Sequence, residues 1–365
     1  MSIGVGVWGT GNMGRASVAA VLGHPELELR AVLTSTAAKA GRAASELAGD
    51  GGRGRTEVTI THSDDAADLV DRGCSAVVYA ASGDVRPDEA LEDIRGCLAA
   101  GLTVVSPAIY ALYDPASAPV EVREPIERAC RSGGSSLFVS GVDPGWGNDL
   151  LPLLATGLCH DITSVRSLEI FDYSSYDQEF SVRELVGMGK AMDYEPPMVA
   201  QGVPTMVWGG QVRLVAEGLG VHLDGIEESL ERVALDTDVH TAMGLFEAGT
   251  QGALRFEVIG HVGGIPAVVV EHVTRIHPSV APEWPQPASG AGSHRVVIEA
   301  EPRLEITVEA EAEGGNRAAG GNATAAMRLV GAIPWLCEAD PDLYDGTQVP
   351  LEPGRGRFVA PNTTT

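Results

Sequence analysis

Cationic side chains are scarce in this chain of 365 residues. It has 25 Lys and Arg residues against 50 Asp and Glu residues, so its formal net charge is −25. Only two of the cations are lysines, Lys39 and Lys190. A surface of this sign repels nucleic-acid phosphates and anionic lipid head groups, so we expect no nucleic-acid partner and no membrane partner.

Cysteines and long apolar runs are also few. The five cysteines are scattered and form no CxxC pair, which is typical of reduced thiols and predicts neither disulfides nor a metal site. No apolar run reaches the roughly 18 residues that span a bilayer. The first residues carry no basic region ahead of their apolar stretch, so we expect no signal peptide and a cytoplasmic location.

The first 145 residues alternate short apolar runs with helical stretches. This alternation is typical of βαβ units and predicts an α/β fold with a Rossmann-type, doubly wound parallel sheet. The predicted strands are 3–8, 27–33, 58–60, 76–81, 102–105 and 137–139, and the predicted helices are 12–22, 87–99 and 119–131. We expect residues 1–145 to form a dinucleotide-binding domain, with a C-terminal helix at about 320–345 packing back onto it.

Residues 146–319 are expected to form a second, α+β domain with an open mixed sheet, for substrate binding and dimerisation. The partly alternating stretches predict strands at 165–173, 254–260, 267–276, 295–300 and 304–310. Helices are predicted at 148–158 and 211–219, with an acidic helix near 226–232 and a loop at 277–292.

A complete GxGxxG motif follows the first predicted strand and opens a helical stretch. Its residues are Gly9, Thr10, Gly11, Asn12, Met13 and Gly14. The first glycine allows a tight turn, the second lets the backbone approach a pyrophosphate, and the third permits close helix–strand packing. The amides at the helix start then meet the phosphate charge. The motif predicts a dinucleotide site, and a purely structural turn is the alternative.

The end of the second predicted strand favours NADP over NAD. An NAD site usually has an acidic residue here that binds the ribose hydroxyls, but no carboxylate occurs between Arg30 and Glu46. Ser35, Thr36 and Lys39 instead offer hydroxyls and a cation, which suit a 2′-phosphate. NAD stays possible, because Lys39 and Arg42 are also explained by a solvated helix face.

Ligands of a doubly wound sheet bind beyond the carboxyl ends of its strands. Ala81 and Ser82 follow one such strand and Pro107 follows another, and we assign all three to the cofactor site. The segment SGVDPGWGNDLLP, which begins at Ser140, follows a third strand and leads into the second domain. It is expected to be both a hinge and a pocket wall.

Several motifs in one order resemble the family of 2,4-diaminopentanoate dehydrogenase and the native amine dehydrogenases. The first domain of that family is akin to dihydrodipicolinate reductase. The motifs are WGTGNMG, AGLTVVSPAIYALYDP, GVDPGWGNDLLP, RELVGMGK, WGGQVRLVAEGLGVHLDGIEESLERV and NATAAMRLVGAIPWLCEADPDLYDGTQVP. The resemblance implies NAD(P)H-dependent reductive amination of a carbonyl, or the reverse deamination, and a homodimer. It also places Ile109, Trp146, Asn322 and Thr324 in the substrate pocket.

The chain departs from this family where the chemistry is expected. The family has a glutamate just after the fifth strand that handles the amine proton, and Ile109 or Tyr110 stands in its place here. Asp143 replaces the usual Asn of the turn, and Trp146 replaces Phe. The candidates for the lost acid–base role are Tyr110, Asp143 and Tyr173, each with a structural alternative as a packing or turn residue.

These observations predict an oxidoreductase of the amine dehydrogenase type that acts on a small carbonyl compound or amine. One alternative is an NADP-dependent imine or ketone reductase that uses no ammonia. Another is a catalytically weak dinucleotide-binding protein, because the family glutamate is absent. A dihydrodipicolinate reductase is disfavoured, since its basic signature is missing and the stretch offers Asp143, Trp146 and Asp149 instead.

Overall fold

The computed structural model describes residues 2–48, 56–83, 85–176 and 178–358 of the chain. The chain divides into two compact units. The first unit comprises Met1–Gly141 and Asn322–Thr365, and the second comprises Val142–Gly321. The chain therefore leaves the first unit after Gly141 and returns to it at Asn322.

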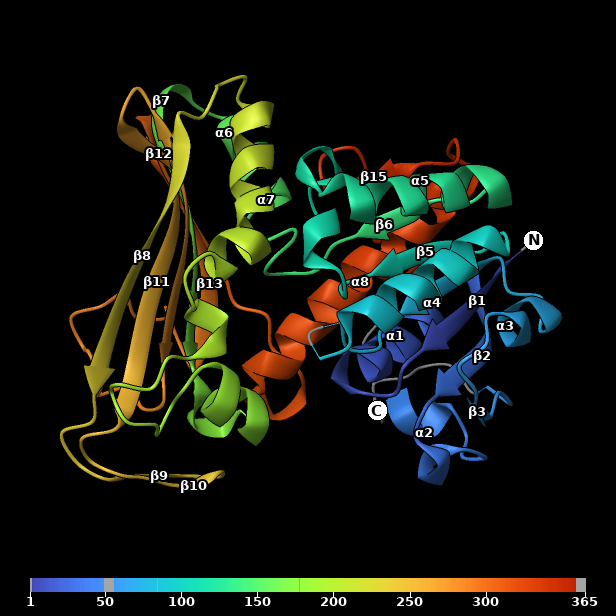
Figure 1. Ribbon diagram of the computed structural model, residues 1–365, viewed down its shortest axis with the longest axis horizontal. Helices are drawn as coiled ribbons and strands as arrows, with labels where there is room; N and C mark the ends of the chain where they lie inside the picture. Colours follow the sequence, from blue (N-terminus) through green and yellow to red (C-terminus); the bar gives the residue numbers. More distant parts are fainter. Residues whose placement is uncertain (1, 49–55, 84, 177, 359–365) are drawn as a thin grey trace, which may run out of the picture. The chain divides into compact units, whose positions relative to one another are not determined.

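The first unit is built on a parallel sheet, which confirms the predicted Rossmann-type fold class. Seven strands are described, in the order β15-β6-β5-β4-β1-β2-β3 (Figure 1). The topology reverses direction between β1 and β4, and this reversal is the switch point at which doubly wound sheets bind ligands. The strands are β1 (Ile3–Trp8), β2 (Leu27–Thr34), β3 (Ile60–His62), β4 (Ala76–Tyr79), β5 (Thr103–Ser106), β6 (Leu137–Val139) and β15 (Leu343–Tyr344).

Helices cover both faces of this sheet. Buried side chains of α3 (Ala67–Asp71), α4 (Pro87–Ala99) and α5 (Val120–Gly133) share one apolar cluster with one face of the sheet. The other cluster joins the opposite face to α1 (Asn12–Leu22) and α8 (Arg317–Glu338). Burial from two sides explains why the strands are almost wholly apolar. The short helices of this unit are η1 (Ala37–Lys39), α2 (Ser45–Ala48), η3 (Tyr110–Leu112) and η4 (Pro115–Ser117).

The second unit contains a mixed sheet in the order β14-β13-β7-β12-β11-β8. The neighbours β7 and β12 are parallel, and the other pairs are antiparallel. The strands are β7 (His160–Asp172), β8 (Gly225–Ala234), β11 (Gln251–Val262), β12 (Ile265–Arg275), β13 (Gly292–Glu301) and β14 (Leu304–Val308). A separate hairpin pairs β9 (Val239–Thr241) with β10 (Gly244–Phe246).

Two helices pack on one face of the mixed sheet. They are α6 (Leu150–Thr156), capped by the Asp149 carboxylate, and α7 (Val203–Gly218). The approach of α7 to β11 is so close that a Cβ atom on Gly260 would lie 2.6 Å from a Val212 methyl group. Short helical turns connect these elements, namely η5 (Tyr173–Ser175), η6 (Ser181–Leu185, a π-helix), η7 (Pro197–Val199) and η8 (Glu313–Gly315).

One predicted element is wrong. The stretch 226–232 was expected to be an acidic helix, but it lies within strand β8, antiparallel to β11. The glutamates of β8 have partners on both faces of the sheet. Glu231 pairs with Arg255 on β11 at 3.2 Å, and Glu228 accepts hydrogen bonds from the Gly202 and Thr205 amides at the start of α7. Tertiary partners thus outweigh local helix propensity.

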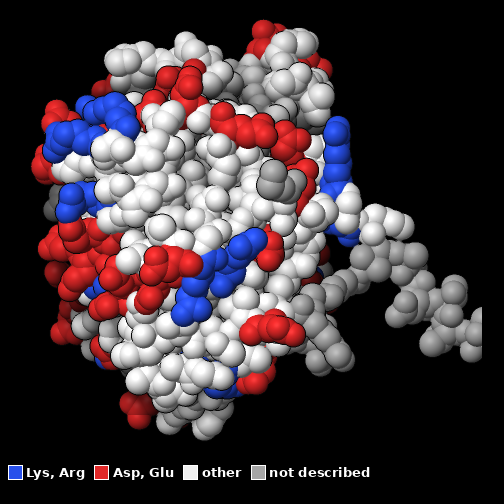
Figure 2. Space-filling view, turned by 90° about the vertical axis from the view of Figure 1, so that its right-hand side faces the viewer, with Lys and Arg blue, Asp and Glu red and all other residues white. Residues whose placement is uncertain are grey.

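The acidic excess of the sequence is visible on the molecular surface. On the face drawn in Figure 2, acidic side chains form several patches. The basic patches between them are smaller. Across the described residues, no helix is both long enough and apolar enough to cross a membrane.

Candidate functional site

The glycine motif forms the turn between β1 and α1 in the first unit. Gly9 has a φ of +121°, and a Cβ atom there would lie 2.7 Å from the Ala80 carbonyl group. A Cβ atom on Gly14 would lie 2.0 Å from the Gly9 oxygen. Around the Cβ position of Gly11, by contrast, no described heavy atom lies within 4 Å apart from those of the adjoining backbone and chain neighbours. Two glycines therefore make the turn, and the third leaves open space in front of the helix.

This open space suits a pyrophosphate. Gly11 is the N-cap of α1, no side chain caps that helix, and no acidic residue lies in its first turn. Its first amide groups and the positive end of the helix dipole thus remain available to an anion. The turn fits the phosphates of a dinucleotide, with Asn12 and Met13 opening the helix behind Gly11.

Lys39 lies at the rim of this turn. Its Nζ atom donates hydrogen bonds to the Thr10 carbonyl at 3.1 Å and to the Thr10 hydroxyl at 3.3 Å. The Thr10 hydroxyl in turn lies 2.9 Å from the Thr34 hydroxyl at the end of β2. Among the described residues, Lys39 has no acidic partner. Its charge therefore stays uncompensated beside the exposed Ser35 and Thr36.

Arg42 is arranged differently. It pairs with Glu46 at 3.1 Å, and both side chains are exposed. The alternative interpretation of a solvated face therefore describes Arg42, whereas the Lys39 side chain turns toward the glycine motif.

The loops after β4 and β5 lie against each other. A Cβ atom on Gly83 would lie 1.9 Å from the Ala108 carbonyl oxygen. The Ser106 hydroxyl donates to the Tyr79 carbonyl and accepts from the Ala108 amide. These contacts hold the loops that carry three of the predicted cofactor residues, of which Ala81 and Pro107 are half-buried and Ser82 is exposed.

The predicted residues after β5 belong to the first unit and contact its apolar cluster. Ile109 is buried in the apolar cluster, and Tyr110 packs against the same cluster and stacks on Tyr113 with ring centroids 6.3 Å apart. The half-buried Asn322 and Thr324, also assigned to the substrate pocket, lie on α8 in this unit. Trp146 and the other two acid–base candidates belong to the second unit.

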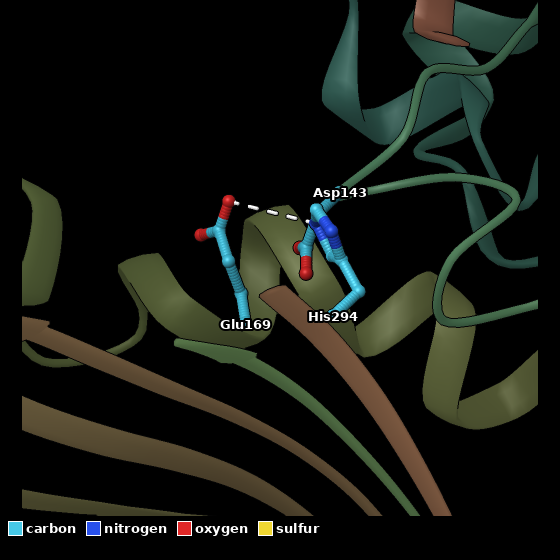
Figure 3. Close-up of side chains that lie close together, drawn as sticks. All are labelled: Asp143, Glu169 and His294. Carbon is cyan, nitrogen blue, oxygen red and sulfur yellow. Dashed lines mark ion pairs between the residues drawn. The ribbon is translucent and has the colours of Figure 1, made fainter. Parts of the chain in front are cut away.

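A row of ionisable side chains crosses the mixed sheet of the second unit. Glu169 on the central strand β7 is in register with His272 on β12 and with His294 on β13. Asp143, from the segment after β6, joins this row on the face that α6 and α7 cover. Figure 3 shows the side chains of Asp143, Glu169 and His294 pointing toward one another. We refer to Asp143, Glu169, His272 and His294 as the acid–base cluster.

Asp143 is held by two hydrogen-bond donors. Its Oδ1 atom accepts hydrogen bonds from the Trp208 indole at 2.7 Å and from His272 Nε2 at 2.9 Å. The His272 ring stacks on Phe256 with centroids 4.5 Å apart and lies 4.4 Å from the Trp208 ring. Helix α7 thereby fixes the Asp143–His272 pair inside an aromatic environment.

Burial and the charges of their neighbours shift the pKa values of these four groups in different directions. Burial opposes ionisation of Asp143 and His272, but their pairing outweighs it, so the pKa of Asp143 is lowered and that of His272 is raised. Burial, together with the Asp143 charge, raises the pKa of Glu169 to about 8. Burial lowers the pKa of His294. At neutral pH the cluster is therefore an Asp143–His272 ion pair beside a protonated Glu169 and a neutral His294.

Tyr173 lies next to the cluster. Burial, followed by the nearby Glu169 and Asp143 charges, raises its pKa well above the ordinary value. Its ring stacks on Tyr176 with centroids 4.8 Å apart and meets Phe171 edge-on at 6.5 Å. A phenol with a raised pKa keeps its proton, so Tyr173 is suited to donate a hydrogen bond and not to act as a base.

The structure thus brings Asp143 and Tyr173 together around residues that sequence reasoning left without a role. Glu169, His272, His294 and Trp208 are far apart in the chain, and strand pairing joins the first three. A signal was present in the sequence. Glu271 and His272 end the apolar run of the predicted strand 267–276, and Glu169 shares one face of β7 with Phe171, since side chains alternate along a strand.

Comparisons with known proteins identify the family of the chain. The model of the 2,4-diaminopentanoate dehydrogenase C-terminal domain family matches residues 148–354. An amine dehydrogenase of Streptomyces virginiae is 58% identical over 354 residues, which are 96% of this chain and 97% of that protein.

The chain belongs to the amine dehydrogenase and 2,4-diaminopentanoate dehydrogenase family. The 2,4-diaminopentanoate dehydrogenase of Acetoanaerobium sticklandii is 26% identical over 266 residues, 72% of this chain and 70% of that protein. A solved amine dehydrogenase from Mycobacterium smegmatis has the same fold, with a TM-score of 0.74 and 18% identity over 96% of this chain and 97% of that one. The family resemblance inferred from the motifs is confirmed, and the protein is an enzyme of the dehydrogenase class.

Proposed function

We propose that the protein is an NADPH-preferring amine dehydrogenase that interconverts a small carbonyl compound plus ammonia with the corresponding primary amine. The observation that carries the proposal is the glycine turn with the uncompensated Lys39 at its rim, in a chain of the amine dehydrogenase family. NADPH supplies the hydride when it is bound. The chain's own groups bind it, orient it and handle protons.

The cofactor preference is argued from charge. A 2′-phosphate adds negative charge and oxygen acceptors at the end of β2, where an NAD site would have a carboxylate. Lys39 is the nearby cation without an acidic partner in the described structure, and Ser35 and Thr36 add hydroxyl groups. NADH lacks the phosphate and leaves the Lys39 charge uncompensated.

The substrate class is argued from the acid–base cluster of the second unit. Besides burial, the groups that shift the pKa values of its members are one another, the Glu271 carboxylate and the Asn148 amide. No lysine or arginine of the described chain is among them, so the cluster offers nothing to pair with a substrate carboxylate. Its carboxyl groups and aromatic rings instead suit an amine with apolar substituents.

A coupled assay tests this function. NADPH consumption is measured with a panel of small ketones and aldehydes, in ammonium chloride and in potassium chloride of equal ionic strength, and the amine product is identified by mass spectrometry. We expect turnover that requires ammonium and is faster with NADPH than with NADH. Equal turnover in potassium chloride would instead identify a ketone reductase. NADPH binding without turnover at any pH would identify a dinucleotide-binding protein.

A further inference from the structure

Glu169 is the most exposed member of the acid–base cluster and has no close hydrogen bond to the other members. Its side chain is 22% exposed, whereas those of Asp143 and His272 are 3% exposed and that of His294 is 6% exposed. Its carboxyl oxygens lie 3.5 Å from His272 Nε2 and 3.8 Å from His294 Nε2. Both distances exceed the 2.7–3.2 Å of a good hydrogen bond, so within the described structure this carboxyl group is held near its neighbours without being bonded to them.

His294 presents an unsatisfied atom to the same place. Its Nε2 atom is buried and has no hydrogen-bond partner in the described structure. An unpaired buried polar atom is costly, and a ligand that donates a hydrogen bond to it would satisfy it. One atom each from Asp143, Glu169 and His294 lies within 4.8 Å of the other two. Three potential acceptors thus surround one small space (Figure 3).

The spacing of these three atoms admits either an ammonium nitrogen or a metal ion. Three N–H donors at tetrahedral angles, each about 2.8 Å from its acceptor, place the acceptors ~4.6 Å apart. Zinc bonds of about 2.1 Å would place the ligands ~3.4 Å apart. The limit of 4.8 Å admits both arrangements, and the Glu169–His294 separation of 3.8 Å falls between the two values. Charge distinguishes them, because one carboxylate, that of Glu169, balances ammonium but not Zn²⁺. The Asp143 charge is also already balanced by His272.

We propose that Glu169, together with Asp143 and His294, forms the ammonium-binding and proton-transfer site of this enzyme. The proposal rests on the proposed function. Glu169 thereby takes the role for which the sequence retains no glutamate after β5. Asp143 and His294 are positioning residues that accept N–H hydrogen bonds and hold the nitrogen beside the Glu169 carboxylate.

The proton balance of the step is simple. The positive charge of bound ammonium favours the ionised form of Glu169, whose proton is retained when no cation is near. The ammonium then gives a proton to this carboxylate, and the freed nitrogen lone pair forms a bond to the carbonyl carbon. The carbonyl π electrons move to oxygen, which takes a proton from nitrogen to give a carbinolamine. The Glu169 proton then passes to the hydroxyl oxygen, the C–O bond breaks, and water leaves. The remaining iminium is the group that a bound nicotinamide cofactor would reduce, and Glu169 is again a carboxylate.

Glu169→Gln tests the proton transfer, with Glu299→Gln as the matched control. Glu299 lies on β13, is exposed, and within the described residues forms an ion pair with Arg303 alone, at 3.0 Å. We expect Glu169→Gln to lower kcat for reductive amination by roughly 10²- to 10⁴-fold without changing the Kd for NADPH. Reduction of a preformed cyclic imine, which needs neither ammonia nor C–O cleavage, should stay within about tenfold of wild type. Unchanged amination, or an equal loss with both substrates, would overturn the proposal.

Ammonium binding is tested without turnover. The thermal unfolding midpoint is measured in ammonium chloride and in potassium chloride at equal ionic strength. We expect a higher midpoint in ammonium chloride for wild type and Glu299→Gln, and no difference for Glu169→Gln or His294→Gln. The absence of an ammonium effect in wild type would overturn the site. So would a larger shift with zinc chloride that Glu169→Gln abolishes, because it would identify a metal centre.

The two tests also separate this site from the proposed function. Should the carbonyl panel give no amine while the ammonium shift persists and depends on Glu169, the binding site stands and the proposed reaction fails. Should amines form at equal rates in wild type and Glu169→Gln, the reaction stands and the site fails.

Discussion

At the scale of single residues, Lys39 and Arg42 show how two cations of one segment acquire different roles. Lys39 donates to both oxygens of Thr10 in the glycine turn, whereas Arg42 pairs with the exposed Glu46. Exposed ion pairs of this kind contribute little to the stability of the fold. An uncompensated ammonium group beside a bound phosphate strengthens its binding through charge-assisted hydrogen bonds.

We therefore expect Lys39→Ala to raise the Kd for NADPH by about tenfold, which corresponds to ~1.4 kcal/mol, and to leave the Kd for NADH nearly unchanged. Both constants are measurable by fluorescence titration. Arg42→Ala is the matched control and should bind both cofactors like wild type. An equal loss for NADPH and NADH in Lys39→Ala would show that Lys39 only supports the turn.

Glu169 makes the stability of the protein depend on pH. Burial and the Asp143 charge raise its pKa from about 4.5 to about 8, so the folded chain binds this proton more tightly than the unfolded chain. The stabilisation by Glu169 is therefore complete below about pH 4.5 and is lost as the pH rises to about 8.

Urea unfolding of wild type and Glu169→Gln over this range measures the effect. The difference in unfolding free energy, wild type minus variant, should fall with rising pH by up to about 1.4 kcal/mol per pH unit. Glu299→Gln, whose side chain is exposed, should show the pH profile of wild type. A difference that is flat with pH would mean that Glu169 ionises in the native state as it does in the unfolded chain.

At the scale of elements, the β1–α1 turn separates the structural and ligand-binding roles of glycine. The Cβ position of Gly14 coincides with the Gly9 carbonyl, but that of Gly11 faces open space. We expect Gly14→Ala to lower the unfolding midpoint by several degrees, because the helix must move away from the strand.

Gly11→Ala should leave the midpoint within about a degree of wild type while weakening NADPH binding at least tenfold, since the added methyl group occupies the path of the pyrophosphate. Calorimetry and cofactor titration on the same preparations distinguish the two variants. Unimpaired NADPH binding by Gly11→Ala would exclude this turn as the cofactor site.

The elements of the second unit show where a local sequence pattern predicts the wrong secondary structure. The predicted strands of this unit were found, each with ends that differ by a few residues, and the helix predicted at 211–219 begins earlier, at Val203. Strand β8 was misread because its glutamates resemble a solvated helix face. Only the register with β11 shows that they alternate between Arg255 on one face and the start of α7 on the other.

At the scale of the whole molecule, the net charge of −25 is a source of self-repulsion in the folded state. Salt screens this repulsion, because the Debye length shortens from about 30 Å at 0.01 M to about 8 Å at 0.15 M ionic strength. We expect sodium chloride to raise the unfolding midpoint at pH 8 over this range.

The same addition should have little effect near the pI of 4.6, where the net charge vanishes. Differential scanning calorimetry at the two pH values measures both effects. A midpoint at pH 8 that falls with salt would show that attractive ion pairs, such as those of Arg166 with Glu257 and Glu271 on the mixed sheet, outweigh the repulsion.

The sequence by itself determined the parallel-sheet fold class, the family and the glycine motif, because each is a local or ordered pattern. Six consecutive residues form the turn. The length and spacing of the apolar runs predict the strands. Tertiary structure decided the acid–base cluster. Glu169, His272 and His294 are separated by more than a hundred residues at the widest, and they meet only through the register of β7, β12 and β13. A shift of one residue would turn each side chain to the opposite face, so no local pattern contains that information.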